Sequence, residues 1–337
     1  MPVDIFNNSA FTWMEMTDSI NVVPNKYGRL QQIGLFTRRG VTTRTVSINI
    51  EQGTLNLLPT RPVGGTPTLG TMAKGKIKSF TVPHIPHDDQ VLAQDVQGVL
   101  GAAALRGDGT GLKSVQELVN EKLATMRAKH DITLEYLRWG AVSGIILDAD
   151  GSVILNLFTD FGLTEKVIDF ELDVDTTDVA AKVMELKTWM EDNLFGEQMN
   201  GIRVFASPTF FSALIKHPAI KEYLTQFRGT ARLGEDYRNA FEYMGVIFEQ
   251  QSGRASDIDG NVHKFVADGT ARAVPLGTEI FKTYDAPADF NEAVNTPGLP
   301  IYAKQKTTDF ERGIRIHTQS NPLPLALRPQ LLVKLTI

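Results

Sequence analysis

The sequence contains no cysteine among its 337 residues. This absence excludes disulfides, thiolate nucleophiles and cysteine-based zinc sites, and it leaves the redox compartment open. No apolar run reaches the roughly 18 to 20 residues that a membrane span requires. Residues 1–20 also lack the basic and apolar regions of a signal peptide. We therefore expect a soluble chain that is synthesised in the cytosol.

Excess positive charge is also lacking, because the formal net charge is −5. A chain that wraps nucleic acid by counterion release usually carries a basic stripe, so this charge argues against such a role. Neither a Walker A sequence nor a G-x-S-x-G nucleophile elbow occurs. Nucleotide hydrolysis and serine hydrolase chemistry are therefore not indicated.

What the sequence does contain is an ordinary globular composition, with 42% hydrophobic and 22% charged residues. Residues 45–50 alternate between apolar and polar side chains, which predicts a half-buried strand. A proline- and glycine-rich tip at 59–70 and a second alternating strand at 74–82 follow. One face of this second strand carries Lys74, Lys76 and Lys78. An isolated two-stranded ribbon is marginal in water, so we expect it to lie on another molecule.

Residues 114–140 give the strongest helical pattern, with a Ser114–Glu117 capping box at the start. His130 lies on its apolar stripe and is interpreted as a packed, hydrogen-bonded core histidine, with metal ligation as the alternative. A hairpin turning at Asp150-Gly151 follows the helix. Two further helices are predicted, at 178–195 and after Ser207, with a strand between them and short strands towards the C-terminus. The pattern predicts an α+β protein.

The run TVPHIPHDD, residues 81–89, is the candidate for metal chemistry, through His84, His87 and Asp88. Prolines on both sides make a helix implausible there, so the two histidines would splay apart. The alternative interpretation is a rigid bend after the ribbon, with Asp88 and Asp89 capping a short turn or helix.

The sequence VPHIPHDDQVLAQDVQGV at 82–99 resembles a motif of the lambda-type phage major capsid proteins, capsid family E. In that family a histidine–isoleucine–proline stretch, paired acids and a D-[IV]-Q-G segment follow an extended loop. The C-terminal passage FERGIRIHTQSNPLPLALRPQLLVKL is similar as well. The loop at 52–70, the helix from 114 and the hairpin after it come in the expected order, so the resemblance covers most of the chain.

The resemblance implies the Hong Kong 97 capsid fold. The corresponding segments would be an N-terminal arm at 1–40, an extended loop (E-loop) at 41–83 and a peripheral domain at 84–177 that contains a spine helix at 114–140. An axial domain at 178–285 would follow, and 286–337 would return to the peripheral domain. No long, charged helical segment precedes the arm, so we expect a separate scaffold protein and no cleavage of this chain. Covalent cross-linking is not predicted.

The resemblance implies a major capsid protein that assembles into hexamers and pentamers of an icosahedral shell around double-stranded DNA, without enzymatic activity or cofactors. Its partners would be itself, a scaffold protein, a portal protein and a decoration protein. It would be assembled in the host bacterial cytoplasm and located in the virion. We expect inter-subunit contacts from eight charged residues: Arg38, Arg39, Arg44, Lys74, Lys76, Lys78, Asp88 and Asp89.

Two alternatives remain open at this point. An encapsulin-like compartment has the same fold but would enclose an enzyme instead of DNA. A metal-dependent enzyme would use His84, His87 and Asp88.

Overall fold

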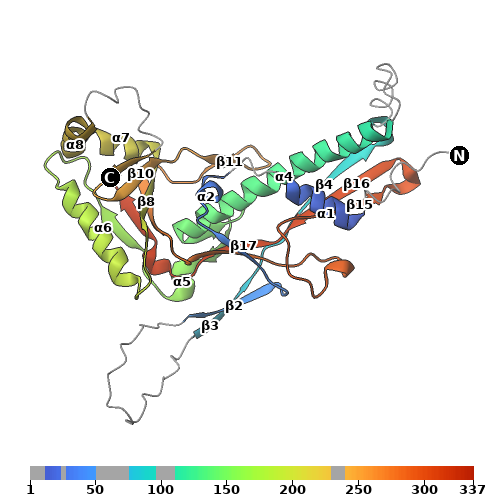
Figure 1. Cartoon of the computed structure of the whole chain (residues 1–337), viewed down its shortest axis with the longest axis horizontal. Coiled ribbons are helices and arrows are strands. Elements are labelled where there is room, and N and C mark those ends of the chain that lie inside the picture. Colours follow the sequence, from blue (N-terminus) through green and yellow to red (C-terminus); the bar gives the residue numbers. More distant parts are fainter. Residues whose placement is uncertain (1–11, 24–27, 51–75, 96–110, 229–239) are drawn as a thin grey trace, which may run out of the picture. The chain divides into compact units, whose positions relative to one another are not determined.

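The computed structural model of the chain describes residues 12–23, 28–50, 76–95, 111–228 and 240–337 (Figure 1). The described helices are α1 Trp13–Val22, α2 Arg29–Gln32, α4 Gly111–Ser143, α5 Leu157–Phe161, α6 Val179–Asn193, α7 Pro208–Lys216 and α8 Pro218–Arg228, with 3-10 turns at Asn291–Ala293, Asp309–Glu311 and Pro329–Leu331.

The first nine strands are β1 Thr37–Gly40, β2 Thr45–Ile50, β3 Lys76–Thr81, β4 Ile85–Leu92, β5 Ile145–Leu147, β6 Val153–Asn156, β7 Lys166–Asp169, β8 Gly201–Ala206 and β9 Phe241–Tyr243. The other nine are β10 Val246–Gln250, β11 Arg254–Ser256, β12 Val262–Lys264, β13 Thr270–Leu276, β14 Phe281–Asp285, β15 Tyr302–Thr307, β16 Gly313–Ser320, β17 Pro322–Ala326 and β18 Val333–Thr336. Helices and strands are both well represented.

The chain divides into two compact units, each built from three separate stretches of sequence. Unit 1 comprises Met1–Val46, Thr81–Leu137 and Lys282–Leu325. Unit 2 comprises Ser47–Phe80, Arg138–Phe281 and Ala326–Ile337. The boundary between them falls inside α4, near its C-terminal end. The division differs from the predicted return at 286–337, because the last strand, β18, joins a sheet of unit 2.

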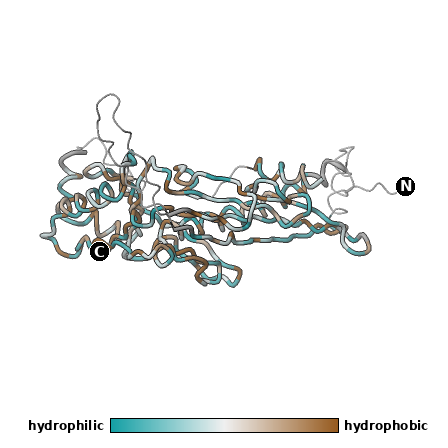
Figure 2. Tube along the Cα trace, turned by 90° about the horizontal axis from the view of Figure 1, so that it is seen from below, coloured by the Kyte–Doolittle hydropathy of each residue, from teal (hydrophilic) through white to brown (hydrophobic). Residues whose placement is uncertain are grey.

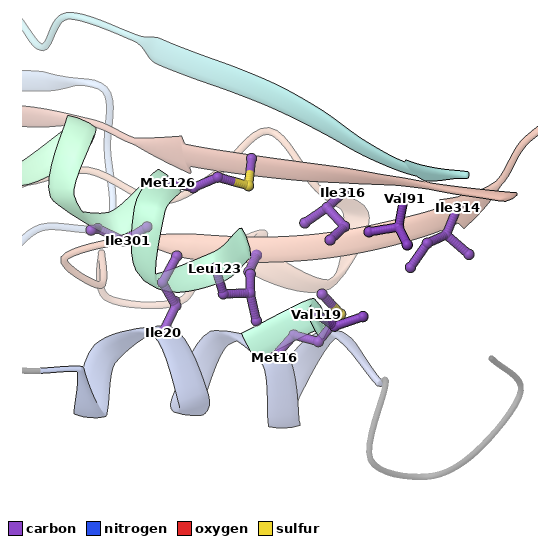
Figure 3. Packing of buried hydrophobic residues seen from close by; sticks show 10 residues of the cluster. Met16, Ile20, Val91, Val119, Leu123, Met126, Ile301, Ile314 and Ile316 are labelled. Carbon is purple, nitrogen blue, oxygen red and sulfur yellow. The ribbon is translucent and has the colours of Figure 1, made fainter. Parts of the chain in front are cut away.

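Unit 1 is built on α4, which packs against the antiparallel sheet β15-β16-β4. Val119, Leu123 and Met126 from α4 meet strand residues such as Val91 and Ile316 in one buried cluster (Figure 3). The periodicity of the sequence predicted this helix at 114–140, and the structure extends it to Gly111–Ser143. A second sheet of this unit, β1-β14-β17, has Pro322 and Pro324 on its edge strand β17. Edge strands tolerate proline because no ladder hydrogen bond is lost there.

The N-terminal segment of unit 1, residues 12–23 and 28–40, is fastened to its own chain. Met16 and Ile20 of α1 are buried in the α4–sheet cluster. The Thr17 hydroxyl donates to the carbonyl of Ala303 at 3.2 Å and accepts from its N–H at 3.1 Å, as a neighbouring strand would. The described part of the segment therefore contains a helix, α1, that packs against its own chain.

Two hydrogen bonds from α4 complete this fastening. The Arg127 guanidinium donates to the carbonyl oxygen of Ile20 at 2.8 Å. Further along, the Glu135 carboxylate accepts from the N–H of Leu30 at 2.9 Å, at the first turn of α2. Gly28 lies so close to Glu135 that an added Cβ would come within 2.6 Å of its carboxylate oxygen. The entry into α2 therefore depends on glycine as well as on the buried carboxylate.

Unit 2 contains a six-stranded mixed sheet in the order β7-β18-β13-β8-β10-β9. Helix α7 packs on β8, β10 and β13, and it begins as the sequence predicted, with Ser207 accepting from the N–H of Phe210 and Pro208 in the first turn. The buried face of α6 is Val179, Val183, Leu186 and Met190. The hairpin β5–β6 turns at the predicted Asp150-Gly151.

The strands β2 and β3 form a separate two-stranded ribbon, as the alternating sequence predicted. Its tip, with residues 59–70, lies outside the described residues. Apolar and polar residues alternate along much of the trace (Figure 2), and no helix in the described part of the chain is long and apolar enough to cross a membrane.

Candidate functional site

The histidine–aspartate run lies on a strand. After a short break at 82–84, residues Ile85–Leu92 form β4, which pairs antiparallel with β16. The predicted bend is therefore limited to this break, and the prediction that Asp88 and Asp89 cap a turn or helix was wrong. Pro86 is accommodated because β4 is the edge strand of its sheet, where a missing N–H costs no ladder hydrogen bond.

The two histidines of the run have separate partners. The Nδ1 atom of His84 lies 2.9 Å from the side-chain oxygen of Asn321. The Nε2 atom of His87 lies 3.1 Å from Nζ of Lys129, so it accepts a hydrogen bond from the ammonium group. Burial, followed by the charge of Lys129, lowers the pKa of His87. Within the described residues, no group of three or more histidine and carboxylate side chains is placed to hold a metal ion.

His130 of α4 is a buried, neutral core histidine, as predicted, with 3% of its surface exposed. The Thr318 hydroxyl donates to the backbone carbonyl of His87, so it must accept from Nε2–H of His130 at 3.0 Å. Nδ1 of His130 then accepts from the Ser320 hydroxyl at 2.8 Å. Burial, with a smaller effect of nearby cationic groups, lowers the pKa of His130 to about 3. These bonds hold the ring as a single neutral tautomer.

Asp88 and Asp89 point to opposite faces of β4 and form different ion pairs. Asp88 accepts from Arg315 and from Nδ1 of His317 on β16. Asp89 meets Nζ of Lys122 on α4 at 3.2 Å. Although partial burial opposes the effect, hydrogen bonds lower the pKa of both carboxyl groups, from His317 and Arg315 at Asp88 and from the N–H of Gln90 and Lys122 at Asp89. Both aspartates are therefore ionised near neutral pH and tie β4 to its own neighbours.

The predicted contact arginines of the N-terminal segment differ in their surroundings. Arg38 forms a two-pronged ion pair with Asp285, with N–O distances of 2.9 and 2.7 Å. Only 3% of the Asp285 side chain is exposed, so this pair is part of the structure of unit 1. The side chains of Arg39 and Arg44 are exposed.

The ribbon lysines are only partly described. Lys74 and the side chain of Lys76 lie outside the described residues. Nζ of Lys78 lies 4.0 Å from a carboxylate oxygen of Asp160, with both side chains more than a third exposed. Such a pair contributes little to stability. On the same face of β3, the buried ring of Phe80 stacks on Phe161 at 6.1 Å between centroids. The ribbon is thus anchored to unit 2 at its root.

Sequence reasoning missed one exposed aromatic residue. Phe310, in the turn between β15 and β16, has 88% of its surface exposed and a φ of +61°. The left-handed region costs a non-glycine residue roughly 1–2 kcal/mol. A phenylalanine inside the polar turn sequence TTDFERG, between two strands, was the signal that could have found it.

The polar groups described above do not form a catalytic arrangement. The histidines and carboxylates of β4 are engaged by separate partners, and no nucleophile with an adjacent base stands out among them. What the described surface offers instead is a projecting ribbon, exposed arginines and an exposed aromatic residue, which are features of an interaction surface.

Solved structures with a similar fold were found at low sequence identity. The proposed capsid protein of a prophage in Escherichia coli CFT073 matches with a TM-score of 0.61 at 15% identity, covering 97% of this chain and 99% of that one. A phage-related protein from Bordetella bronchiseptica RB50 matches with a TM-score of 0.52 at 12% identity, covering 97% of both chains. The predicted α+β class and Hong Kong 97 capsid fold are confirmed.

Sequence comparison gives the family. The chain is 30% identical to the major capsid protein of Salmonella phage Felix O1, over 96% of both chains. It is 27% identical to the major capsid protein of Pseudomonas phage KPP10, over 99% of this chain and 98% of that one. The family model described as phage major capsid protein E matches residues 12–337. The chain therefore belongs to the phage major capsid protein E family.

Proposed function

We propose that this chain is the shell subunit of a tailed phage or prophage, and that it self-assembles into hexamers and pentamers of an icosahedral shell around double-stranded DNA. The observation that carries the proposal is the likeness to two phage major capsid proteins along nearly the full length of each chain. The matching relatives are named as major capsid proteins, and we propose a structural role without enzymatic activity for this chain.

The mechanism we propose is geometrical. The β2–β3 ribbon projects from a short root, and a two-stranded ribbon alone buries too little apolar surface to be stable in water. Lying on a neighbouring subunit would supply the missing contacts. Because a shell repeats each contact many times, individually weak interactions add up to a stable assembly.

The domain assignment follows from this mechanism. We propose that 41–83 is the E-loop, that 84–177 with its long helix is the peripheral domain, and that 178–285 is the axial domain. Residues 286–337 would return to the peripheral domain, although β18 at their end pairs with β7 and β13. Residues 1–40 would correspond to the arm.

For the inter-subunit contacts we propose first the exposed Arg39 and Arg44 and the lysines of the ribbon. Arg38, Asp88 and Asp89 have strong partners in their own chain. If one of these residues contacts a neighbouring subunit, it has to form that contact while its intrachain ion pair is kept. The pairs therefore favour a smaller role for these three residues in assembly.

Scaffold, portal and decoration proteins are the further partners we propose, with assembly in the host bacterial cytoplasm and a final place in the virion shell. The net charge of −5 fits a shell that encloses DNA without binding it tightly. His84, His87 and Asp88 have separate protein partners, which argues against the metal-dependent enzyme as an alternative.

Electron microscopy of the full chain, expressed alone and together with the scaffold protein of its phage, tests the proposal. We expect closed particles of uniform diameter in the micrographs. Sedimentation should show either shells of several hundred subunits or separate capsomers. A chain that stays monomeric under both conditions would contradict it. Particles that enclose an enzyme in place of DNA would point to an encapsulin-like compartment.

A further inference from the structure

The turn between β15 and β16 holds an aromatic side chain in water. Phe310 is 88% exposed, whereas most phenylalanine side chains in the described core are nearly or fully buried. Leu92, at 44% exposure, lies opposite Gly313 in the register of β4 and β16, at the same end of the strand pair. Both residues therefore expose apolar surface at this end of the strand pair, and exposed apolar surface is a feature of interaction sites.

The backbone at Phe310 has a conformation that suits glycine or asparagine, with φ +61° and ψ 22°. The hairpin turns at Gly151 and Gly260 use glycine at their positive-φ positions. Because 88% of its surface is exposed, packing within the described part of the chain compensates little for this strain. A strained residue that keeps a large exposed side chain indicates a role for that side chain outside the monomer.

The turn is nevertheless held firmly. The N–H and hydroxyl of Thr308 both donate to the carbonyl of Gly313, at 2.9 and 3.0 Å. The N–H of Ala93 donates to the carbonyl of Arg312 at 2.8 Å. At Gly313 an added Cβ would come within 2.3 Å of the carbonyl oxygen of Val91. The backbone that carries Phe310 is therefore held in place, which reduces the backbone entropy lost when the side chain binds.

Arg312 contacts the Phe310 ring. Its guanidinium lies 5.5 Å from the centre of the Phe310 ring, in a cation–π arrangement. Aromatic and arginine side chains are the residues most enriched at the centres of protein interfaces.

We propose that Phe310, supported by Arg312, is an anchor that packs into an apolar surface of a second copy of this chain. The inference rests on the proposed function, because copies of a shell protein contact one another. One phenylalanine buries far less than the roughly 1,600 Å² of a stable two-protein interface. The anchor therefore cannot hold a dimer by itself, and it acts where other contacts already bring copies together.

The test is shell formation by the full-length chain, measured by sedimentation and electron microscopy, with Phe310→Asn and Phe310→Trp. Asparagine suits the left-handed backbone, so the melting temperature of unassembled Phe310→Asn should equal or exceed that of the wild type. We expect its shell yield to fall at least tenfold, and Phe310→Trp to stay within threefold of wild type. Ile258→Asn, at a fully exposed residue of unit 2, is the matched control and should assemble normally.

A photo-reactive benzoylphenylalanine at position 310 identifies the occupant. Cross-linking in assembled shells should give peptides joining position 310 to another copy of this chain. Cross-links to a different protein, or none, would overturn the inference, as would a Phe310→Asn shell yield within twofold of wild type. An equal loss in Ile258→Asn would also overturn it. If the wild-type chain forms no shells, the proposed function itself fails, which separates the two results.

Discussion

The N-terminal segment and the β2–β3 ribbon were both expected to reach across neighbouring subunits, yet their own chain holds them very differently. In the described segment, α1 buries Met16 and Ile20, its Thr17 hydroxyl bonds the backbone of Ala303, and Arg127 donates to the carbonyl of Ile20. The ribbon is held at its root by the Phe80–Phe161 stack and a long Lys78–Asp160 pair. The first is part of unit 1, and for the second we propose that a neighbouring subunit supplies the missing contacts.

This difference indicates which segment assembly has to stabilise. A helix with a buried apolar face and paired backbone groups is stable before assembly. A two-stranded ribbon that packs on its own chain only near its root is expected to gain most of its stability from the surface on which it lies. The ribbon is therefore the element through which assembly can change the stability of the subunit.

The largest effect is expected from breaking the anchorage of α1. Ile20 is fully buried, and Ile20→Ala should lower the free energy of unfolding of the unassembled chain by about 2–5 kcal/mol through lost contacts and a cavity. Chemical denaturation measures this. Val22→Ala on the same helix, at 81% exposure, is the control and should change stability by less than about 0.5 kcal/mol. Equal effects would mean that α1 is not anchored in its own chain.

A somewhat smaller loss is expected at the end of the N-terminal segment. Arg38→Ala leaves the buried carboxylate of Asp285 without its two-pronged partner and should destabilise the unassembled chain by about 2–3 kcal/mol. Arg39→Ala changes the adjacent exposed residue and should leave the unfolding midpoint unchanged. If Arg38→Ala leaves the monomer stable and affects shell formation alone, Arg38 contacts a neighbour as first predicted.

A lower pH is expected to destabilise unit 1 through His130. His130 is held neutral with a pKa of about 3, against 6.5 for an ordinary histidine, so below pH 6.5 the unfolded chain binds a proton that the folded chain does not. Its contribution to stability should fall by about 1.4 kcal/mol per pH unit, or about 2 kcal/mol between pH 6.5 and 5. Urea unfolding of wild type and His130→Gln measures this. The same pH slope in both proteins would contradict the assignment.

The smallest effect on the monomer is expected in the ribbon. Lys76→Glu with Lys78→Glu should change the free energy of unfolding by less than about 1 kcal/mol, because the Lys78–Asp160 pair is exposed and 4.0 Å long. Shell assembly should be impaired by the same double change. Melting curves and sedimentation of one sample give both quantities. Normal assembly would remove the lysine face from the interface.

Local patterns predicted much of the fold, because the physical cause was local. The Ser207–Pro208 helix start and the Asp150-Gly151 turn were confirmed, whereas the long helix begins at Gly111, three residues before the predicted cap at Ser114. His130 was predicted correctly, since a histidine on an apolar helical stripe is usually buried. The α+β class followed from the same periodicities.

Pairing over long sequence distances was not predictable in this way. β4 was interpreted as a bend because Pro83 precedes it and Pro86 lies within it, which hides the edge strand, and its partner β16 lies more than 200 residues away. The ion pair of Arg38 with Asp285 depends on the parallel pairing of β1 with β14. The strain at Phe310 depends on backbone geometry that no residue pattern encodes.

Hydrogen exchange measured by mass spectrometry on the unassembled chain and on assembled shells is the most direct test of the central claim. Amides of β2 and β3 should exchange rapidly in the unassembled chain and become protected on assembly, while α1 should be protected in both states. Contradiction would take either of two forms: a ribbon that is equally protected before assembly, or an α1 that gains its protection only in the shell.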